Sequence, residues 1–276
     1  EGVKSLRPEL EILLEGRDGS SIPEMLDEQV AAVLINHVDY RSGTIRDMEN
    51  LTRQVQEFGG LAVWDLSHSA GIFPVQLNRC RVDFAVGCTY KYLNGGPGAP
   101  AYLYAASRHH AACNQPLSGW FGHARPFDFE RHFDPDSGIR RFVCGTQPIL
   151  SLRALQSGLE IYQDVSLQQV REKSMALTDL FIKLLKNECA AWELEIISPE
   201  DASQRGSQVA VSHPEGYAVM QALISRGVIG DFRAPNLMRF GFAPLFLSYQ
   251  DIHDAVKQLK QILESEEWNQ EAFLQK

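Results

Sequence analysis

The chain has 276 residues, of which 44% are apolar, and its formal net charge is -9. This length and composition are typical of a globular protein of one or two domains that buries a sizeable core. The acidic balance argues against nucleic acid or an anionic membrane as the main partner. No apolar run in the sequence approaches the ~18 residues of a membrane-spanning helix.

The five cysteines are odd in number and never form a C-x-x-C pair, so neither a disulfide framework nor a zinc site is expected. Reduced thiols in a cytoplasmic protein are the simplest interpretation. No signal peptide pattern opens the sequence. The first residue is Glu1 rather than Met, which favours a fragment or a processed chain.

The first half of the chain alternates strand and helix patterns. A short helix with capping-box spacing is predicted over 21–29, and a longer one over 46–60 that ends at a pair of glycines. The nearly continuous apolar run at 30–36 is typical of a strand covered on both faces. Three further strands are predicted at 61–65, 82–88 and 99–105. This alternation predicts a mostly parallel α/β sheet.

The second half has a different character. Two long amphipathic helices are predicted, and short strand candidates and a final helix follow them. The predicted helices cover 148–165, 166–188 and 250–267, and the strand candidates cover 192–198, 207–213 and 237–244. We therefore expect a large domain over 1–164 and a smaller α+β domain over 165–276.

Two chemically active side chains follow predicted strands. Asp65 ends the strand at 61–65, and Lys91 lies just past the strand at 82–88. Ligands of open α/β sheets gather beyond the carboxyl ends of the strands. A lysine and a carboxylate at one sheet edge suit pyridoxal phosphate (PLP), whose aldehyde needs an amine and whose ring nitrogen needs an acid partner.

Each of these residues also has an ordinary interpretation. Asp65 could cap a helix, Lys91 could be a solvated surface residue, and His68 could be a satisfied polar residue under a loop. A Gly-rich run such as "NGGPGAP" is most often a turn. The order and spacing of the residues together favour the cofactor.

Four segments carry a resemblance to a known family. They are "DLSHSAG" at 65–71, "YKYLNGGPG" at 90–98, "SGWFGH" at 118–123 and "CGTQPILSL" at 144–152. In order and spacing they resemble the kynureninase family, which belongs to the class-V aminotransferase group of fold-type I PLP enzymes. The resemblance covers about residues 30–264. It implies a mostly parallel sheet with helices on both faces and a smaller α+β C-terminal domain.

The resemblance also implies an activity and a setting. Kynureninases hydrolyse L-kynurenine, and 3-hydroxykynurenine, to anthranilate, or 3-hydroxyanthranilate, and L-alanine. The implied enzyme depends on PLP, is a cytoplasmic homodimer, and serves tryptophan catabolism and NAD biosynthesis. No metal is implied. The family's N-terminal part is not matched, which implies that this chain is N-terminally truncated and lacks other cofactor-binding residues.

Motif by motif, the resemblance implies roles for particular residues. Lys91 is the implied Schiff-base lysine and Asp65 the partner of the pyridine nitrogen. His68 would lie beside the cofactor. Tyr90 would reach the phosphate and assist proton transfer. Asn36 stands where many members use a serine as a phosphate ligand, and its amide can donate the same hydrogen bond.

Three further residues match positions outside this cluster. Trp120 and Thr146 match residues that family members contribute from the neighbouring subunit, which is why a homodimer is implied. Arg239 matches the arginine that binds the α-carboxylate of the substrate. The ordinary alternatives are packing for Trp120, a helix N-cap near Gln147 for Thr146, and a surface ion pair for Arg239.

Two other functions compete with this interpretation. The first is a cysteine desulfurase-like lyase, or another enzyme of the class-V aminotransferase group. A desulfurase needs a persulfide-forming cysteine ahead of the carboxylate-binding arginine, but no cysteine occurs between Cys189 and Arg239. The "SGWFGH" segment lies outside the aminotransferase pattern. The second is a cofactor-free interaction domain that retains the fold, which the visible absorbance of bound PLP would exclude.

Overall fold

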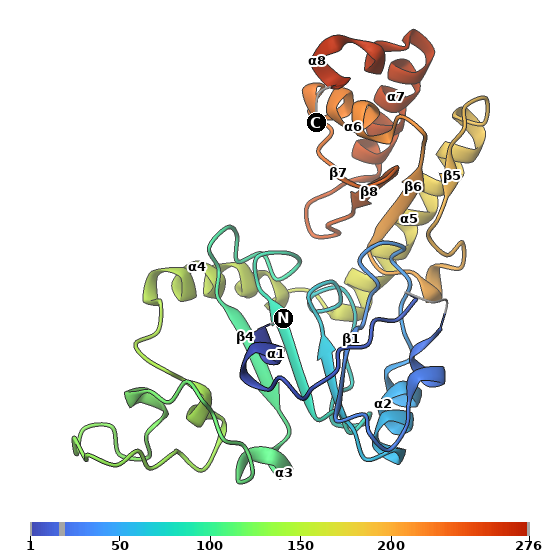
Figure 1. Cartoon of the computed structure of the whole chain (residues 1–276). Helices are drawn as coiled ribbons and strands as arrows, with labels where there is room; N and C mark the ends of the chain where they lie inside the picture. Colours follow the sequence, from blue (N-terminus) through green and yellow to red (C-terminus); the bar gives the residue numbers. More distant parts are fainter. Residues whose placement is uncertain (1, 17–19, 275–276) are drawn as a thin grey trace.

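The computed structural model describes residues 2–16 and 20–274, and it contains two four-stranded sheets (Figure 1). In the first sheet the strands follow chain order, β1-β2-β3-β4. β1 to β3 run parallel, and β4 pairs with β3 in the antiparallel sense. The strands are β1 (Ala32–Asn36), β2 (Leu61–Asp65), β3 (Phe84–Cys88) and β4 (Ala101–Ala105). All four lie within the ranges that the sequence predicts.

Helix α2 (Met48–Glu57) covers one face of this sheet. Asp47 caps its N-terminus by accepting a hydrogen bond from the backbone N–H of Asn50. Past its C-terminus, Gly59 takes a positive φ of 82°, a conformation that suits glycine. The Trp64 ring is buried under the helix, and its indole N–H donates to Thr52 Oγ1 at 2.9 Å. Apolar burial and a satisfied indole together fix α2 on the sheet.

On the face of the first sheet opposite α2, β1 is exposed, although the sequence predicts a strand that is covered on both faces. Leu34, at the centre of that strand, is 68% exposed, and Leu103 on β4 is also exposed. Both side chains point away from α2, because alternate residues of a strand face opposite sides. The predicted burial of β1 on both faces is therefore wrong for the described residues, among which no helix covers Leu34.

Short elements connect the two sheets. Residues 111–148, green in Figure 1, extend away from both sheets and contain only single-turn helices. Helix α4 follows them and leads into a last single turn before the second sheet. These elements are α3 (Ser107–His110), η2 (Trp120–Gly122), η3 (Ile139–Phe142), α4 (Ile149–Glu160) and η4 (Ile161–Gln163).

The second sheet is antiparallel, with the strand order β5-β6-β8-β7. Its strands are β5 (Glu195–Ile196), β6 (Gln208–Ser212), β7 (Asp231–Arg233) and β8 (Leu237–Gly241). Its helices are α5 (Leu167–Glu188), α6 (Gly216–Ser225) and α7 (Tyr249–Ser265). The structure confirms α5, β5, β6 and β8 within the predicted ranges, and α7 begins one residue before its range of 250–267. The sequence patterns did not predict β7 and α6.

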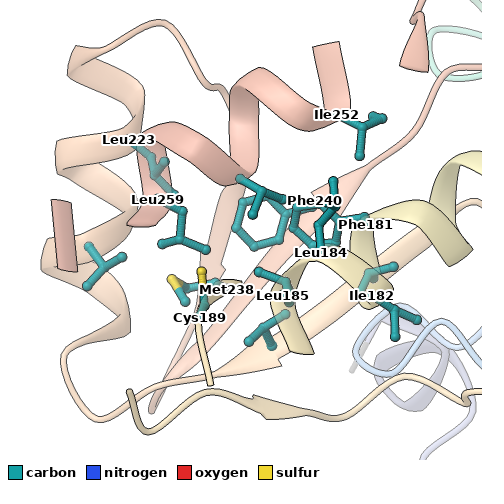
Figure 2. Close-up of a cluster of buried hydrophobic side chains, with 14 of the residues drawn as sticks. Phe181, Ile182, Leu184, Leu185, Cys189, Leu223, Met238, Phe240, Ile252 and Leu259 are labelled. Atoms are coloured by element: carbon teal, nitrogen blue, oxygen red, sulfur yellow. The ribbon is translucent and has the colours of Figure 1, made fainter. Parts of the chain in front are cut away.

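Figure 2 shows the core that joins this sheet to its helices. Phe181 of α5 packs against Phe240 of β8 with ring centroids 4.9 Å apart, and Leu223 and Leu259 are buried from α6 and α7. The Cys189 side chain is fully buried in the same cluster. A capping box at Ser166 satisfies backbone N–H groups at the N-terminus of α5 and so defines where this helix begins.

The remaining elements are short. They are α1 (Gly2–Leu6), η1 (Ile22–Met25), η5 (Ala202–Gln204), η6 (Glu267–Asn269) and α8 (Glu271–Leu274). The helix predicted over 21–29 is thus a single turn, with the expected contact from the Ser21 N–H to the Glu24 carboxylate at 2.8 Å. The division into 1–164 and 165–276 stays a prediction, and its outermost residues, 1 and 275–276, lie outside the described part.

Within the described ranges, no helix combines the length and the apolar character needed to span a membrane. The same residues form no group of three or more His, Cys, Asp and Glu side chains that could hold a metal ion.

Candidate active site

The carboxyl ends of β1 and β2 place an amide beside a carboxylate. Asn36 and Asp65 are the last residues of their strands and are register partners in the parallel pair. Asp65 Oδ1 accepts a hydrogen bond from the Ser67 N–H at 2.8 Å, which fixes the carboxyl group at the start of the following turn. Asp65 caps this turn rather than a helix.

Lys91 lies beyond the end of β3 and contacts His68. Its Nζ is 3.1 Å from His68 Nε2, and the lysine side chain is half-buried. The glycine loop that follows keeps the chain close to the sheet. At Gly95, a Cβ would lie within 2.7 Å of Ala99 Cβ and 2.9 Å of the Thr89 carbonyl oxygen. The loop therefore needs a glycine for close approach as well as for turning.

His68 is neutral at physiological pH. Burial, then the positive charges of Lys91 and Arg239, lower the pKa of its imidazole to about 4. The neutral ring carries one N–H and one free lone pair, so it can accept a hydrogen bond from Lys91 Nζ. Nearby Asp65 and Asp231 oppose this shift without reversing it.

Tyr90 precedes the lysine and remains half in solvent. The residue is 51% exposed, and Lys91 Nζ lies 5.5 Å from the centroid of its ring. Desolvation and the neighbouring Cys88 thiol raise the pKa of the Tyr90 phenol. Its hydroxyl therefore keeps its proton at neutral pH and acts as a hydrogen-bond donor.

Arg239 reaches the site from the second sheet. It lies on β8, and its guanidinium contacts both carboxylate oxygens of Asp231 on β7 as well as the backbone carbonyl of Tyr40. Desolvation acts to raise the pKa of Asp231, but the hydrogen bond and charge of Arg239 outweigh it and lower that pKa. The arginine is buried, so a simple surface ion pair does not describe it.

Trp120 and Thr146 lie in segments that are close to each other but apart from Lys91 and His68. Gly119 packs directly against the backbone of Cys144, which brings the segments of the two residues together. Trp120 is 45% exposed and contacts Phe121 and Phe127. The described residues show no hydrogen bond or ring contact from Trp120 or Thr146 to Lys91.

Thr146 also does not cap α4. Pro148 holds the N-cap position, and the helix begins at Ile149, one residue after the start of the predicted range 148–165. The Thr146 side chain is exposed. Two participants in the site were not found from the sequence, Asp231 and the Tyr40 carbonyl, because neither belongs to a recognisable motif and both depend on the contact between the sheets.

Sequence comparisons support the resemblance to kynureninases. The family described as "Kynureninase C-terminal domain" matches residues 170–259. The chain is 49% identical to the kynureninase of Burkholderia mallei strain SAVP1 over 256 residues, which is 93% of this chain and 62% of that protein. It is also 49% identical to the kynureninase of Pseudomonas fluorescens over 252 residues, 91% of this chain and 61% of that protein. The chain thus spans about three fifths of the length of these relatives.

Structural comparisons confirm the fold class. The apo cysteine desulfurase from Thermococcus onnurineus NA1 matches with a TM-score of 0.75 and 18% identity, covering 88% of this chain and 62% of that one. A variant of C-DES with glycine covalently linked to its PLP cofactor matches with a TM-score of 0.76 and 17% identity, covering 87% and 62%. At this level of identity the likeness concerns the fold alone. The predicted fold-type I α/β architecture is confirmed.

Proposed function

We propose that this chain, a member of the kynureninase family by its sequence, forms the lysine-bearing part of a PLP-dependent enzyme that hydrolyses L-kynurenine to anthranilate and L-alanine. The corresponding 3-hydroxy substrate, which yields 3-hydroxyanthranilate, is included in the proposal. The observation that carries it is the contact between Lys91 and His68 past the end of β2, the strand that Asp65 terminates, while Arg239 of the second sheet contacts the loop after β1.

The chemistry of these side chains fits PLP. The Lys91 amine would bond the cofactor aldehyde, and the Asp65 carboxylate would pair with the ring nitrogen. Asn36, beside Asp65 in the register, and Tyr90 would contribute to phosphate binding. His68 is neutral, so it adds no positive charge beside the lysine. When bound, the cofactor supplies an electron sink for the carbon atoms of the substrate.

The protein's own residues would bind and orient the substrate. Arg239 would hold its α-carboxylate, since guanidinium and carboxylate groups match in a bidentate pair. Lys91 Nζ would move the proton at the substrate Cα. Tyr90 Oη, which keeps its proton because its pKa is raised, would donate to an oxygen of the substrate or the cofactor phosphate.

Trp120 and Thr146 support a homodimer in this proposal. Both are exposed and separate from the Lys91 cluster, so they would complete the site of a neighbouring subunit. The proposal further places the enzyme in the cytoplasm, in tryptophan catabolism and NAD biosynthesis, with a large domain over 1–164 and a small one over 165–276.

The rival activity is that of a cysteine desulfurase-like lyase, and the thiols of this chain argue against it. No cysteine occurs between Cys189 and Arg239. Cys189 itself is fully buried, and burial raises the pKa of its thiol to about 11. A buried, protonated thiol cannot serve as a mobile nucleophile.

The proposal is tested with the PLP-loaded full-length protein. L-Kynurenine and L-cysteine are supplied separately, and anthranilate fluorescence and released sulfide are measured. We expect anthranilate, no sulfide, and loss of the activity in Lys91→Ala. Sulfide without anthranilate would favour the lyase, and neither product, together with no visible absorbance of bound PLP, would favour a cofactor-free domain.

A second experiment locates the cofactor. The PLP-loaded protein is reduced with borohydride, digested, and its peptides are mapped. We expect the label on Lys91, because this amine lies at the strand edge beside Asp65. A label on another lysine would remove Lys91 from the proposed site.

A further inference from the structure

The Arg239 guanidinium is held by two groups from different parts of the fold. Arg239 and Asp231 are direct register partners in the antiparallel pair of β8 and β7. Asp231 Oδ1 accepts from Arg239 Nε at 2.6 Å, and Asp231 Oδ2 accepts from Nη2. The Tyr40 carbonyl, in the loop after β1, accepts from Nη1. One partner thus belongs to the second sheet and the other to the first.

Counting donors shows what these contacts leave available. A guanidinium has five N–H donors in a fixed plane. Asp231 uses the edge formed by Nε and Nη2, and Tyr40 uses one N–H of Nη1. One N–H therefore remains on each terminal nitrogen. Two N–H groups on neighbouring nitrogens are what a carboxylate needs for a bidentate contact.

Both holding groups are themselves fixed. Asp231 stays opposite Arg239 because the ladder between β7 and β8 sets the register. The Tyr40 carbonyl also accepts a hydrogen bond from Gln208 Nε2 at 3.1 Å, and the Arg239 Cζ lies 5.9 Å from the Tyr40 ring. The Arg239 side chain is 10% exposed and that of Asp231 is 45% exposed. The arginine is thus enclosed, while its carboxylate partner can keep part of its hydration.

We propose that Asp231 is a positioning residue, which orients Arg239 so that its two remaining N–H groups form the binding site for the substrate carboxylate. This inference rests on the proposed function, in which Arg239 binds that carboxylate. A flexible arginine loses rotational freedom when it binds, and a partner that has already fixed its plane removes that loss from the binding step. Asp231 also keeps the enclosed cation paired when no substrate is bound.

The opposite role, in which Asp231 competes with the substrate for Arg239, predicts a different structure. A competitor would occupy the N–H groups that the substrate needs and would have to leave. Asp231 instead uses the Nε edge, and its strand pairing keeps it there. The two roles give opposite effects on affinity, so one set of variants separates them.

The experiment uses the PLP-loaded full-length protein with Asp231→Asn and Asp231→Glu. The isosteric Asp231→Asn should raise the KM for L-kynurenine about 10- to 100-fold with a change in kcat of less than about threefold, as expected when a binding group is misplaced. Asp231→Glu, which keeps the charge, should recover part of the loss.

A binding measurement identifies the carboxylate as the affected group. The dissociation constants of L-alanine and ethylamine, which differ in the carboxylate, are measured by calorimetry. Asp231→Asn should raise the dissociation constant of L-alanine by the same factor as the KM for L-kynurenine. The dissociation constant of ethylamine should stay unchanged. In an Arg239→Ala background, Asp231→Asn should have no further effect on L-alanine, because the two residues act through one interaction.

Two control variants remove a charge elsewhere: Arg233→Ala removes a positive charge close to Asp231, and Glu267→Gln matches the loss of one negative charge. Arg233 is a second cation near Asp231, with its Nη2 3.5 Å from Asp231 Oδ2. Arg233→Ala should leave the affinities for L-alanine and ethylamine unchanged. Glu267→Gln removes the carboxylate that pairs with Arg226 elsewhere in the second sheet's domain and should also leave them unchanged.

The outcomes separate this inference from the proposed function. A lower KM or tighter L-alanine binding in Asp231→Asn would show competition and overturn the inference. If Asp231→Asn weakens the binding of L-alanine and of ethylamine equally, Asp231 has a general structural role, and the inference is also overturned. If the wild-type protein binds L-alanine with the predicted Asp231 dependence but does not cleave kynurenine, the inference holds and the proposed substrate is wrong.

Discussion

At the scale of single residues, buried imidazoles control the charge near the candidate site. Burial lowers the pKa of His37 to about 4, and its ring makes edge contacts with Trp64 and Phe73. Burial, together with Lys91 and Arg239, lowers the pKa of His68 to the same value. Both imidazoles are therefore neutral at pH 7, so neither adds a positive charge to this region.

The lowered pKa values make stability depend on pH. The unfolded chain protonates histidine near pH 6.5 and the folded chain only near pH 4, so between these values the unfolded state binds more protons. Stability should therefore be full above pH 6.5 and should fall as the pH is lowered toward 4. Between pH 7 and pH 5 the loss from His37 should be on the order of 2 kcal/mol.

Denaturant unfolding at the two pH values measures this loss. Because glutamine cannot titrate, the loss of stability between pH 7 and pH 5 should be smaller in His37→Gln than in the wild type, by the contribution of His37. An identical loss in wild type and His37→Gln would contradict the assignment of the effect to His37.

At the scale of elements, the segment 111–148 depends on one close backbone contact. A Cβ at Gly119 would collide with the carbonyl of Cys144, whereas a Cβ at Gly145 would meet nothing within 4 Å. The first contact joins the single-turn helix that begins at Trp120 to the stretch before α4. Because the elements of this segment are too short to be stable alone, the contact determines how Trp120 and Thr146 are presented.

Gly119→Ala should therefore loosen the segment while leaving both sheets intact. We expect faster proteolytic cleavage within 111–148 and, in the full-length protein, a loss of kynurenine cleavage. Gly145→Ala is the matched control in the same segment and should behave like the wild type in proteolysis. Equal cleavage rates for the two variants would show that the Gly119 contact does not hold the segment.

At the scale of the whole molecule, the two sheets are joined by contacts that surround the candidate site. Gln208 Nε2 donates to the Asp39 carbonyl at 3.2 Å, and Tyr92 Oη donates to the Ser207 carbonyl at 2.9 Å. These bonds connect loops of the first sheet to Gln208, the first residue of β6, and to Ser207, which precedes it. Arg239 and Lys91 thus face the same region only because the two halves of the chain meet there.

The proposed homodimer can be tested by mixing two inactive chains of the full-length protein. One carries Lys91→Ala and the other Thr146→Ala, and both must fold. If Thr146 completes the neighbouring subunit's site, a hybrid dimer contains one site with both native residues, and part of the activity should return. No recovery in verified hybrid dimers would place Thr146 in its own subunit's site or outside any site.

Local patterns in the sequence determined much of the first sheet. β2 follows its predicted range, 61–65, residue for residue, and α2 ends at its glycine pair, because apolar periodicity and turn residues act over a few positions. The predicted strand ends place Asp65 and Lys91 at one edge of the sheet. A helix without a polar face is harder to predict: α6 is apolar around most of its circumference and gives no amphipathic pattern.

Only the tertiary structure decided how distant residues meet. Strand β7 has three residues, too few for a periodic pattern, and it is stable because β8 pairs with it. That pairing places Asp231 against Arg239, and the contact between the sheets adds the Tyr40 carbonyl. The sequence by itself therefore determined which side chains stand at the strand ends, whereas the packing of two sheets decided which of them share a site, because such contacts join residues far apart in the chain.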